Sequence, residues 1–447
     1  MPEDRGDPAS PTIRLHVAII ASLSAHPQPD PIVYLEGGPG GSAILGIEDW
    51  VDSPYLGDRE VILFDQRGTG LSEPSLNCEE MEQAYIQVSD DPAKTELAAV
   101  QACHDRLLND GINLSAYTSA ENAADLADLR VALGYPTWNV YGISYGTRLA
   151  LTLMRDHPEG LRSVIIDSVY PPEVNAYEEE AANTQQAFSV LFDGCAAETA
   201  CNAAYPNLKQ TFYALIDTLN DTPAPVNTVD AASGQTVADQ LAGDDVADIV
   251  FQAVYSTSYI AELPSAIYAA SQGDYERLLT MRDGQYPRTR QTDPDLTDSE
   301  GMFNSVECAE EIPFNSLDKA KAAAAQIDAS LQAWVLADLD ITYATCAIWQ
   351  VQSAPAIESQ PVNSDVPTLV LAGEYDPITP PAWGQRAAAN LSHSYFFTFP
   401  GMGHGVTFDD VCPQQISLSF LENPATQPDA SCIKSMSPPN FVTDGSH

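Results

Sequence analysis

Basic residues are scarce in this sequence of 447 residues. Lys and Arg together number 19 against 63 Asp and Glu, so the formal net charge at pH 7 is −44. So negative a protein repels the phosphates of nucleic acids and the headgroups of anionic lipids. We therefore exclude nucleic acids and anionic membrane surfaces as partners. The acidic residues are spread along the chain, which is typical of proteins from salty surroundings and equally of acidic secreted enzymes.

Long apolar runs and zinc-type Cys-x-x-Cys motifs are missing as well. No run approaches the roughly 18 to 20 apolar residues that cross a bilayer, so the sequence predicts no membrane-spanning segment. Without ligand spacings of the zinc type, it also predicts no metal site. Hydrophobic residues make up 44% of the chain, enough for a sizeable core in one large domain with an insertion, or in two domains.

The eight cysteines are an even number and follow one another in four local pairs. Sequential pairing would close four loops, each within one segment of the fold, as in proteins of oxidising compartments. We therefore expect an exported protein. The chain starts without a charged n-region or an apolar h-region, so we expect that any signal peptide is already missing from this sequence. The expected disulfides are Cys78–Cys103, Cys195–Cys201, Cys308–Cys346 and Cys412–Cys432.

The stretch Gly142-Ile143-Ser144-Tyr145-Gly146 has the pattern of a nucleophile elbow. An apolar run, 138–141, precedes it and a helical pattern, 147–154, follows, so Ser144 falls on a turn from strand to helix. The glycines lack Cβ atoms and allow a strained bend with the helix packed close to the strand. The hydroxyl of Ser144 is then exposed, and the backbone N–H of Tyr145 can face a developing oxyanion. A chance match is the alternative interpretation of so short a motif.

Short apolar runs alternate with helical patterns on both sides of this motif. The alternation of apolar and polar residues over Thr12 to Ile20 predicts an antiparallel edge strand. Ser119 is expected to cap a helix over 120–133 that Gly134 ends. Alternating strands and helices predict an α/β fold, with a mostly parallel sheet covered by helices on both faces. The further predicted strands are 32–35, 61–64, 138–141, 163–169, 368–372 and 395–399, and a further helix is 380–390.

The composition changes between residues 173 and 353. Helical patterns rich in Ala, Asp and Gln fill this region, with no convincing buried strand and a break over Asp221 to Gln235. We expect a mainly helical cap at 173–353, inserted into a discontinuous catalytic domain formed by 1–172 and 354–447. The sequence leaves the oligomeric state open.

A serine nucleophile near neutral pH needs an imidazole base, which a carboxylate holds in the right tautomer. In hydrolases with this type of sheet the chain order is Ser, then Asp or Glu, then His. Asp376 follows the predicted strand 368–372 and His404 follows the predicted strand 395–399, so both lie just past strand ends. His393 is the rival base, but it precedes the last strand and lies at its wrong end. A turn initiated by Asp376-Pro377 is compatible with a catalytic role.

Five stretches together resemble one family of enzymes. They are 37–40 (Gly-Gly-Pro-Gly), 65–70 (Asp-Gln-Arg-Gly-Thr-Gly), 142–148 (Gly-Ile-Ser-Tyr-Gly-Thr-Arg), 373–377 (Gly-Glu-Tyr-Asp-Pro) and 403–405 (Gly-His-Gly). The chain is similar to the α/β-hydrolase serine aminopeptidases related to proline iminopeptidase, especially their secreted tripeptidyl branch. Two positions depart from the family: Glu36 stands where a histidine often precedes the glycine loop, and Ser168 replaces a frequent glycine. The change at Glu36 weakens an assignment to proline release.

The resemblance implies a cofactor-free hydrolase with Ser144 as nucleophile, His404 as base and then acid, and Asp376 as its orienting carboxylate. It implies an oxyanion hole formed by the backbone N–H groups of Gly38 and Tyr145. The expected function is release of residues from the free N-terminus of peptides through an acyl-enzyme. A carboxylesterase acting on small esters is the alternative, since both reactions pass through a tetrahedral intermediate. A non-catalytic binding protein is a third reading, disfavoured by the intact order of Ser, Asp and His.

An aminopeptidase also needs a negative site for the substrate ammonium. Relatives of the proline iminopeptidase type use glutamates of the cap for this purpose. Glu310 and Glu311, beside Cys308, are the first candidates and Glu307 is the third. A solvated acidic helix end is the alternative interpretation.

Overall fold

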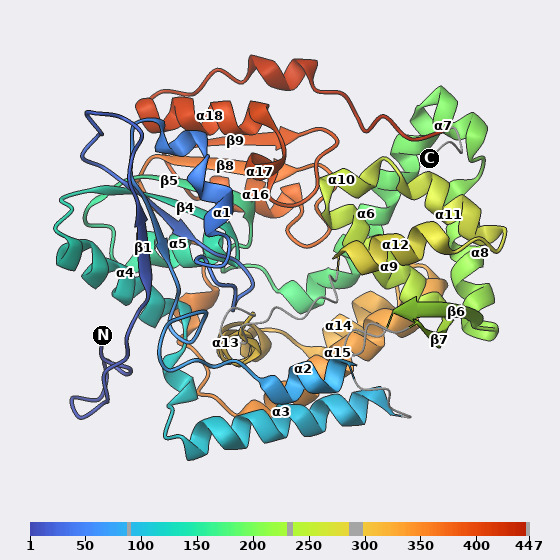
Figure 1. Cartoon of the computed structure of the whole chain (residues 1–447), viewed down its shortest axis with the longest axis horizontal. Coiled ribbons are helices and arrows are strands. Elements are labelled where there is room, and N and C mark those ends of the chain that lie inside the picture. The colour runs from blue at the N-terminus through green and yellow to red at the C-terminus, as the bar shows by residue number, and fades with distance from the viewer. Residues whose placement is uncertain (87–90, 230–235, 286–297, 444–447) are drawn as a thin grey trace.

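A computed structural model describes residues 1–86, 91–229, 236–285 and 298–443 (Figure 1). Its central sheet has seven strands in the order β1-β3-β2-β4-β5-β8-β9, and all neighbours are parallel except the antiparallel edge pair of β1 with β3. The predicted α/β fold is confirmed, although the edge strand is shorter than the alternating pattern suggested. The strands are β1 (Val17–Ile20), β2 (Ile32–Leu35), β3 (Val61–Phe64), β4 (Trp138–Ser144), β5 (Leu161–Val169), β8 (Thr368–Gly373) and β9 (Ser394–Phe399).

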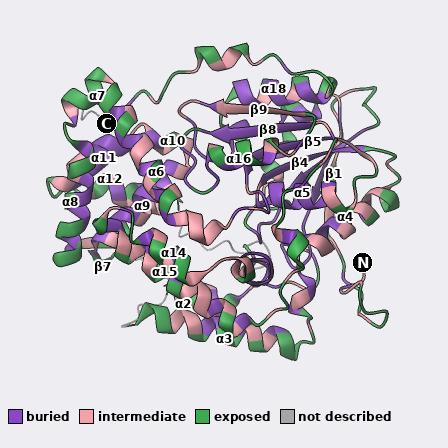
Figure 2. Ribbon diagram, turned by 180° about the vertical axis from the view of Figure 1, so that it is seen from behind, coloured by how far each residue is buried: buried purple, intermediate pink, exposed green. Residues whose placement is uncertain are grey.

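Helices cover both faces of this sheet, which is why β2, β3 and β8 consist entirely of buried residues. Figure 2 shows β8 in the colour of buried residues. Alternate residues of each strand face two separate cores. Val33 and Val140 pack in one core with α4 and α5, whereas Tyr34 and Tyr141 pack in the other with α1 and α18. The helices outside the cap are α1 (Ile47–Val51), α2 (Glu79–Ile86), α3 (Pro92–Asn109), α4 (Ser119–Leu133), α5 (Tyr145–Asp156), α16 (Pro381–Ala388), α17 (Val406–Asp409) and α18 (Val411–Glu422).

Helix α4 differs from its prediction at one end only. Its N-cap is Thr118, whose side chain accepts a hydrogen bond from the N–H of Glu121 (3.3 Å), and Ser119 is already the first helical residue. Gly134 ends the helix in the left-handed region (φ 81°), as predicted.

The chain between β5 and β8 is mainly helical, as predicted, and has its own hydrophobic core. One difference is an antiparallel pair of strands, β6 (Ala224–Val229) within the predicted break over Asp221 to Gln235 and β7 (Thr236–Leu241) directly after it, in a region where the sequence indicated no convincing buried strand. Residues 230–235 of that break lie outside the described residues. The helices of this region are α6 (Ala176–Ala197), α7 (Thr199–Ala204), α8 (Leu208–Asp221), α9 (Gly243–Tyr255), α10 (Thr257–Ile260), α11 (Leu263–Ser271), α12 (Glu276–Gln285), α13 (Glu300–Val306), α14 (Leu317–Ala324) and α15 (Ala329–Trp349).

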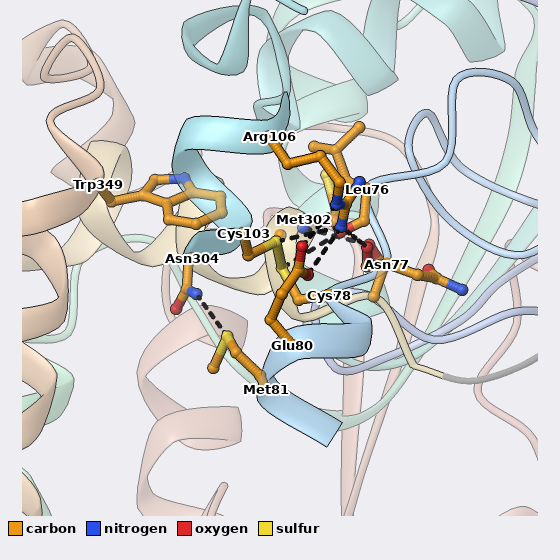
Figure 3. The surroundings of a disulfide bond; sticks show 12 residues. Leu76, Asn77, Cys78, Glu80, Met81, Cys103, Arg106, Met302, Asn304 and Trp349 are labelled. Atoms are coloured by element: carbon orange, nitrogen blue, oxygen red, sulfur yellow. Dashed lines mark hydrogen bonds and ion pairs between the residues drawn. A yellow bond between two sulfur atoms is a disulfide. The ribbon is translucent and has the colours of Figure 1, made fainter. Parts of the chain in front are cut away.

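Packing crosses the domain boundaries expected at residues 172 and 354. The Cys78–Cys103 disulfide joins the start of α2 to α3, and Met302 of α13 and Trp349 of α15 lie beside it (Figure 3). These cap residues share one core with the sheet. Near the other end of the chain, Phe441 is buried in the cap core. The cap therefore has a core of its own, but α13 and the end of α15 pack in a core of the sheet.

The eight cysteines form four disulfides in the predicted sequential pairing. Each one closes a loop within a stretch of 6 to 38 residues. Within the described ranges, no helix combines the length and the apolar character that crossing a bilayer requires.

Candidate active site

Ser144 lies where β4 ends and α5 begins, in a backbone conformation (φ 57°, ψ −127°) that residues with a side chain rarely adopt. The flanking glycines explain how the chain tolerates this bend. A Cβ atom on Gly142 would lie 2.3 Å from the carbonyl oxygen of Gly146, and one on Gly146 would lie 2.1 Å from that of Leu35. Only glycine permits so close an approach of helix and strand, and the elbow predicted from the sequence is present.

The glycine loop after β2 lies directly against Ser144. A Cβ atom on Gly37 would lie 2.9 Å from the Cβ of Ser144, and Gly38 has φ +106°, which favours glycine. Tyr145 is the first residue of α5, so its N–H has no acceptor within that helix. Gly38 and Ser144 line the same cavity. This arrangement suits the predicted oxyanion hole, which stays a prediction.

The motif at residues 65–70 supports this loop from inside the fold. The buried carboxylate of Asp65 accepts hydrogen bonds from the Ser42 hydroxyl (2.9 Å) and from the N–H of Leu71 (3.0 Å). The side-chain amide of Gln66 donates to the carbonyl of Glu36 (3.0 Å), directly before the glycines. These side chains hold the backbone of the loop, and none of them lines the cavity.

Asp376 and His404 form a buried pair. The Nδ1 atom of His404 lies 2.9 Å from Oδ2 of Asp376, and the hydroxyl of Thr379 donates to the same carboxylate oxygen (2.7 Å). Burial raises the pKa of the Asp376 carboxyl, but attraction to His404 and hydrogen bonds from Thr379 outweigh burial, so the pKa lies below its usual value. Asp376 is therefore ionised at neutral pH and can fix the tautomer of His404.

The other ring nitrogen of His404, Nε2, is buried and has no hydrogen-bond partner among the described residues. The residue after His404 lies near the elbow, since a Cβ atom on Gly405 would lie 3.9 Å from Cγ2 of Ile143. The ring of Tyr255, at the end of α9 in the cap, stacks on the imidazole with a centroid distance of 4.3 Å. The structure thus assembles Asp376 with His404 but has no hydrogen bond from His404 to Ser144.

A cavity of about 700 Å³ opens beside Ser144, between the sheet and the cap. Its walls include Tyr170 and Trp383, whose rings stack 5.7 Å apart. None of the described residues that line it is Lys, Arg or His. Its acidic lining residues are Glu180, Asp298, Glu300 and Glu307.

The model of the alpha/beta hydrolase fold family matches residues 30–411, from β2 through the elbow to beyond His404. The chain belongs to the alpha/beta hydrolase family. Serine protease Hip1 of Mycobacterium tuberculosis is 26% identical over 439 residues, covering 89% of this hydrolase and 79% of that protein. Carboxylesterase B of the same organism is 24% identical over 408 residues, covering 83% and 74%. Proline iminopeptidase of Xylella fastidiosa is 30% identical over 146 residues, covering 32% and 34%. The resemblance to serine hydrolases that include peptidases is thereby confirmed.

Glu307 is the one of the three candidate glutamates that lines the cavity of this hydrolase. It begins a single π-helical turn, η4 (Glu307–Glu311), directly after α13, and is 5% exposed. The hydroxyl of Tyr177, on α6, donates to its carboxylate (2.8 Å). Burial, followed by repulsion from Glu311, raises the pKa of Glu307 to about 8. A bound cation would favour its ionised form.

Glu310 and Glu311, which the sequence favoured, have other partners in this hydrolase. Glu310 accepts hydrogen bonds from the N–H (2.6 Å) and hydroxyl (2.7 Å) of Ser119. Arg148, buried on α5, pairs with Glu310 (3.2 Å) and with Glu311. Neither glutamate lines the cavity, because this ion-pair cluster joins the π-helical turn to α4 and α5. Glu307 therefore replaces Glu310 and Glu311 as the first candidate for the amine site, which stays a prediction.

Sequence reasoning missed two residues that touch His404. Thr379 follows Asp376 by three residues, and such a spacing in a turn was the only available signal. Tyr255 lies about 150 residues before His404 in the chain, and no local pattern marks it.

Proposed function

We propose that this hydrolase is an exported serine aminopeptidase, which releases residues from the free N-terminus of peptides. The observation that carries the proposal is the position of Glu307, a buried carboxylate in the wall of the cavity that contains Ser144. A substrate ammonium is a natural partner for a buried carboxylate in a cavity whose described lining residues include no Lys, Arg or His. The names of two relatives, a serine protease and a proline iminopeptidase, support peptides as substrates.

The reaction would begin with attack of the Ser144 hydroxyl on the peptide carbonyl carbon, while Nε2 of His404 takes the hydroxyl proton. Asp376 holds the other ring nitrogen and stabilises the imidazolium. The N–H groups of Gly38 and Tyr145 would stabilise the oxyanion. His404 then protonates the leaving amine, and water hydrolyses the acyl-enzyme by the same steps. Nε2 has no hydrogen-bond partner in the described ranges, and the hydrogen bond to Ser144 would form when substrate is bound.

Export is part of the proposal and rests on the four disulfides, since such bonds persist in oxidising compartments. The high negative charge, −44, suits an extracytoplasmic protein equally well.

Hydrolysis of small esters is the second candidate, because Carboxylesterase B is also a relative. The two functions differ in their need for a free amine. We would measure kcat/KM for aminoacyl-, dipeptidyl- and tripeptidyl-anilides, each free and N-acetylated, and for short nitrophenyl esters. An aminopeptidase prefers the free-amine peptides, whereas equal rates on acetylated peptides, or turnover of esters alone, would favour the esterase.

The matched control is Ser144→Ala, which removes the nucleophile and should abolish turnover of every substrate, by several orders of magnitude, while the protein folds normally. A serine-directed phosphonate should label Ser144 in the unmodified protein and nothing in the variant. Labelling of another serine, with activity surviving in Ser144→Ala, would refute the assignment of the nucleophile.

A further inference from the structure

Two buried polar residues at the carboxyl end of β5, Asp167 and Ser168, lie beneath the loop that carries His404. Both side chains are fully buried, and the reaction described above uses neither. Asp167 follows an apolar strand interior, where an isolated carboxylate is costly unless hydrogen bonds satisfy it. The hydrogen-bond partners of Asp167 therefore indicate its role.

All the strong partners of Asp167 lie just after His404 in the chain. Its carboxylate accepts hydrogen bonds from the N–H groups of Val406 (3.2 Å) and Thr407 (3.0 Å), and from the Thr407 hydroxyl (2.8 Å). The same Thr407 hydroxyl is hydrogen-bonded to Tyr141 on β4, the elbow strand. One carboxylate thus joins the start of α17 to the centre of the sheet.

Ser168 contacts the backbone one residue nearer to His404. Its hydroxyl oxygen accepts a hydrogen bond from the N–H of Gly405 (2.9 Å), the residue directly after His404. Ser168 has φ 59°, a conformation in which glycine would carry no Cβ penalty. Serine is strained there, but its hydroxyl supplies an acceptor that glycine lacks. Three consecutive backbone N–H groups, 405 to 407, are therefore held by two adjacent residues of β5.

The remaining contacts of His404 come from other directions. Its own N–H donates to the carbonyl of Tyr255 (2.8 Å) in the cap, and its ring contacts Asp376 and Thr379 after β8. Asp167 and Ser168 supply the hydrogen bonds that join this loop to β5, the strand next to the elbow strand, within the described part of the chain. These hydrogen bonds hold the backbone directly after His404 against the end of β5. The position of this backbone affects how near Nε2 can come to the Ser144 hydroxyl.

We propose that Asp167 and Ser168 are positioning residues, which hold the backbone after His404 so that Nε2 can reach the Ser144 hydroxyl. The proposal rests on the proposed roles of Ser144 and His404. A catalytic base must lie within hydrogen-bond reach of the proton it takes, and small displacements reduce the rate of chemistry more than they reduce substrate binding. Loss of these contacts should therefore lower kcat and leave KM nearly unchanged.

Ser168→Ala and Ser168→Gly test the proposal, with Ser163→Ala as the matched control. Ser163 is a buried serine near the opposite end of the same strand, and its hydroxyl donates to Asn139 (2.7 Å). We expect both Ser168 variants to lose kcat on the order of ten-fold, less than the roughly hundred-fold that a displacement of about 1 Å can cost. Ser163→Ala should lower Tm by about as much as Ser168→Ala does, because each loses one buried hydrogen bond, and should keep the kcat of the unmodified protein.

Two further measurements separate positioning from general loss of structure. The second-order rate constant for labelling by a serine-directed phosphonate should fall by the same factor as kcat in both Ser168 variants, because labelling also needs His404 but no substrate recognition. Asp167→Asn should lower both rates further, and if it fails to fold, the Ser168 variants still decide. Wild-type kcat in Ser168→Ala and Ser168→Gly, or an equal loss of kcat in Ser163→Ala, would overturn the proposal.

Failure of the positioning role can be told apart from failure of the proposed aminopeptidase function. If the unmodified protein cleaves esters but no free-amine peptide, the aminopeptidase assignment is wrong, and the Ser168 comparison is made on the ester. If the phosphonate does not label Ser144 in the unmodified protein, both proposals are overturned.

Discussion

Glu307→Gln is the substitution that best separates an aminopeptidase from an esterase in this hydrolase. The change keeps the size of the side chain and its hydrogen bond to Tyr177, but removes the carboxyl group in the cavity wall that would ionise when a substrate ammonium binds. A hydrogen bond between the substrate ammonium and a carboxylate contributes about 1.5 to 3 kcal/mol. The variant should therefore lose roughly 10- to 150-fold in kcat/KM on free-amine peptides. Its activity on a small neutral ester should barely change.

The same substitution should change stability with a defined pH dependence. Burial raises the pKa of Glu307 from 4.5 to about 8 in the folded protein, so the folded state favours the protonated carboxyl. Stability from this group is fully present below about pH 4.5 and is lost as the pH rises towards 8, because the unfolded chain then ionises more readily. Glutamine carries no such penalty. We expect Glu307→Gln to have the higher Tm at pH 8.5 and an unchanged Tm at pH 4.5, measured by calorimetry.

Glu300→Gln is the matched control. Glu300 lines the same cavity from the first turn of α13, and burial with repulsion from Asp298 raises its pKa to about 7. It lies roughly 10 Å from Glu307 along the helix axis, at about 1.5 Å per residue. This variant should share the gain in Tm at high pH but keep its preference for free amines. Equal losses on peptides and esters in Glu307→Gln, or an equal loss of preference in Glu300→Gln, would refute the amine site.

Three further predictions address the rest of the site and the fold. Asp376→Asn should lower kcat by about 10⁴-fold with little change in KM, because His404 would lose its orienting carboxylate. If steady-state kinetics show that the variant keeps a tenth of the activity, Asp376 is not the orienting carboxylate. Gly146→Ala places a Cβ 2.1 Å from the carbonyl of Leu35 and should cost at least about 1 to 3 kcal/mol in urea unfolding, whereas Gly57→Ala, where nothing lies within 4 Å, should cost far less. The Cys308–Cys346 disulfide spans 38 residues and Cys195–Cys201 spans 6, so replacing both cysteines by Ala should cost about 4 kcal/mol for the first pair and about 2 kcal/mol for the second. Similar costs for the two pairs, or other linkages in non-reducing peptide mapping, would contradict this last prediction.

The parts of this enzyme that the sequence predicted best are those in which local pattern and global fold agree. Gly142, Ser144 and Gly146 form a turn whose geometry only that spacing of small residues permits, so the elbow was recognisable without tertiary information. Apolar runs of four to seven residues became the buried strands of the sheet, since a parallel sheet covered on both faces needs continuous apolar segments. Cysteine order was sufficient for the disulfides because each pair is local.

The three candidate glutamates for the amine site show where local pattern fails. Glu307, Glu310 and Glu311 lie within one turn, and their order in the chain does not say which of them faces the cavity. Arg148, from the elbow helix, pairs with two of them and leaves the third to the cavity wall. A partner about 160 residues away in the chain therefore decided the assignment.

The sequence by itself determined most strands of the central sheet, the elbow at Ser144 and the disulfide pairs, since each depends on periodicity or spacing within a short segment. It also predicted Asp376 and His404 as the partners of Ser144, from their order in the chain. Tertiary structure alone decided the cavity and its acidic lining, the stacking of Tyr255 on His404, and the contacts of Asp167 and Ser168 with the residues after His404. These features arise where segments distant in the chain meet. Their contacts depend on side-chain packing between elements, which no local pattern of residues encodes.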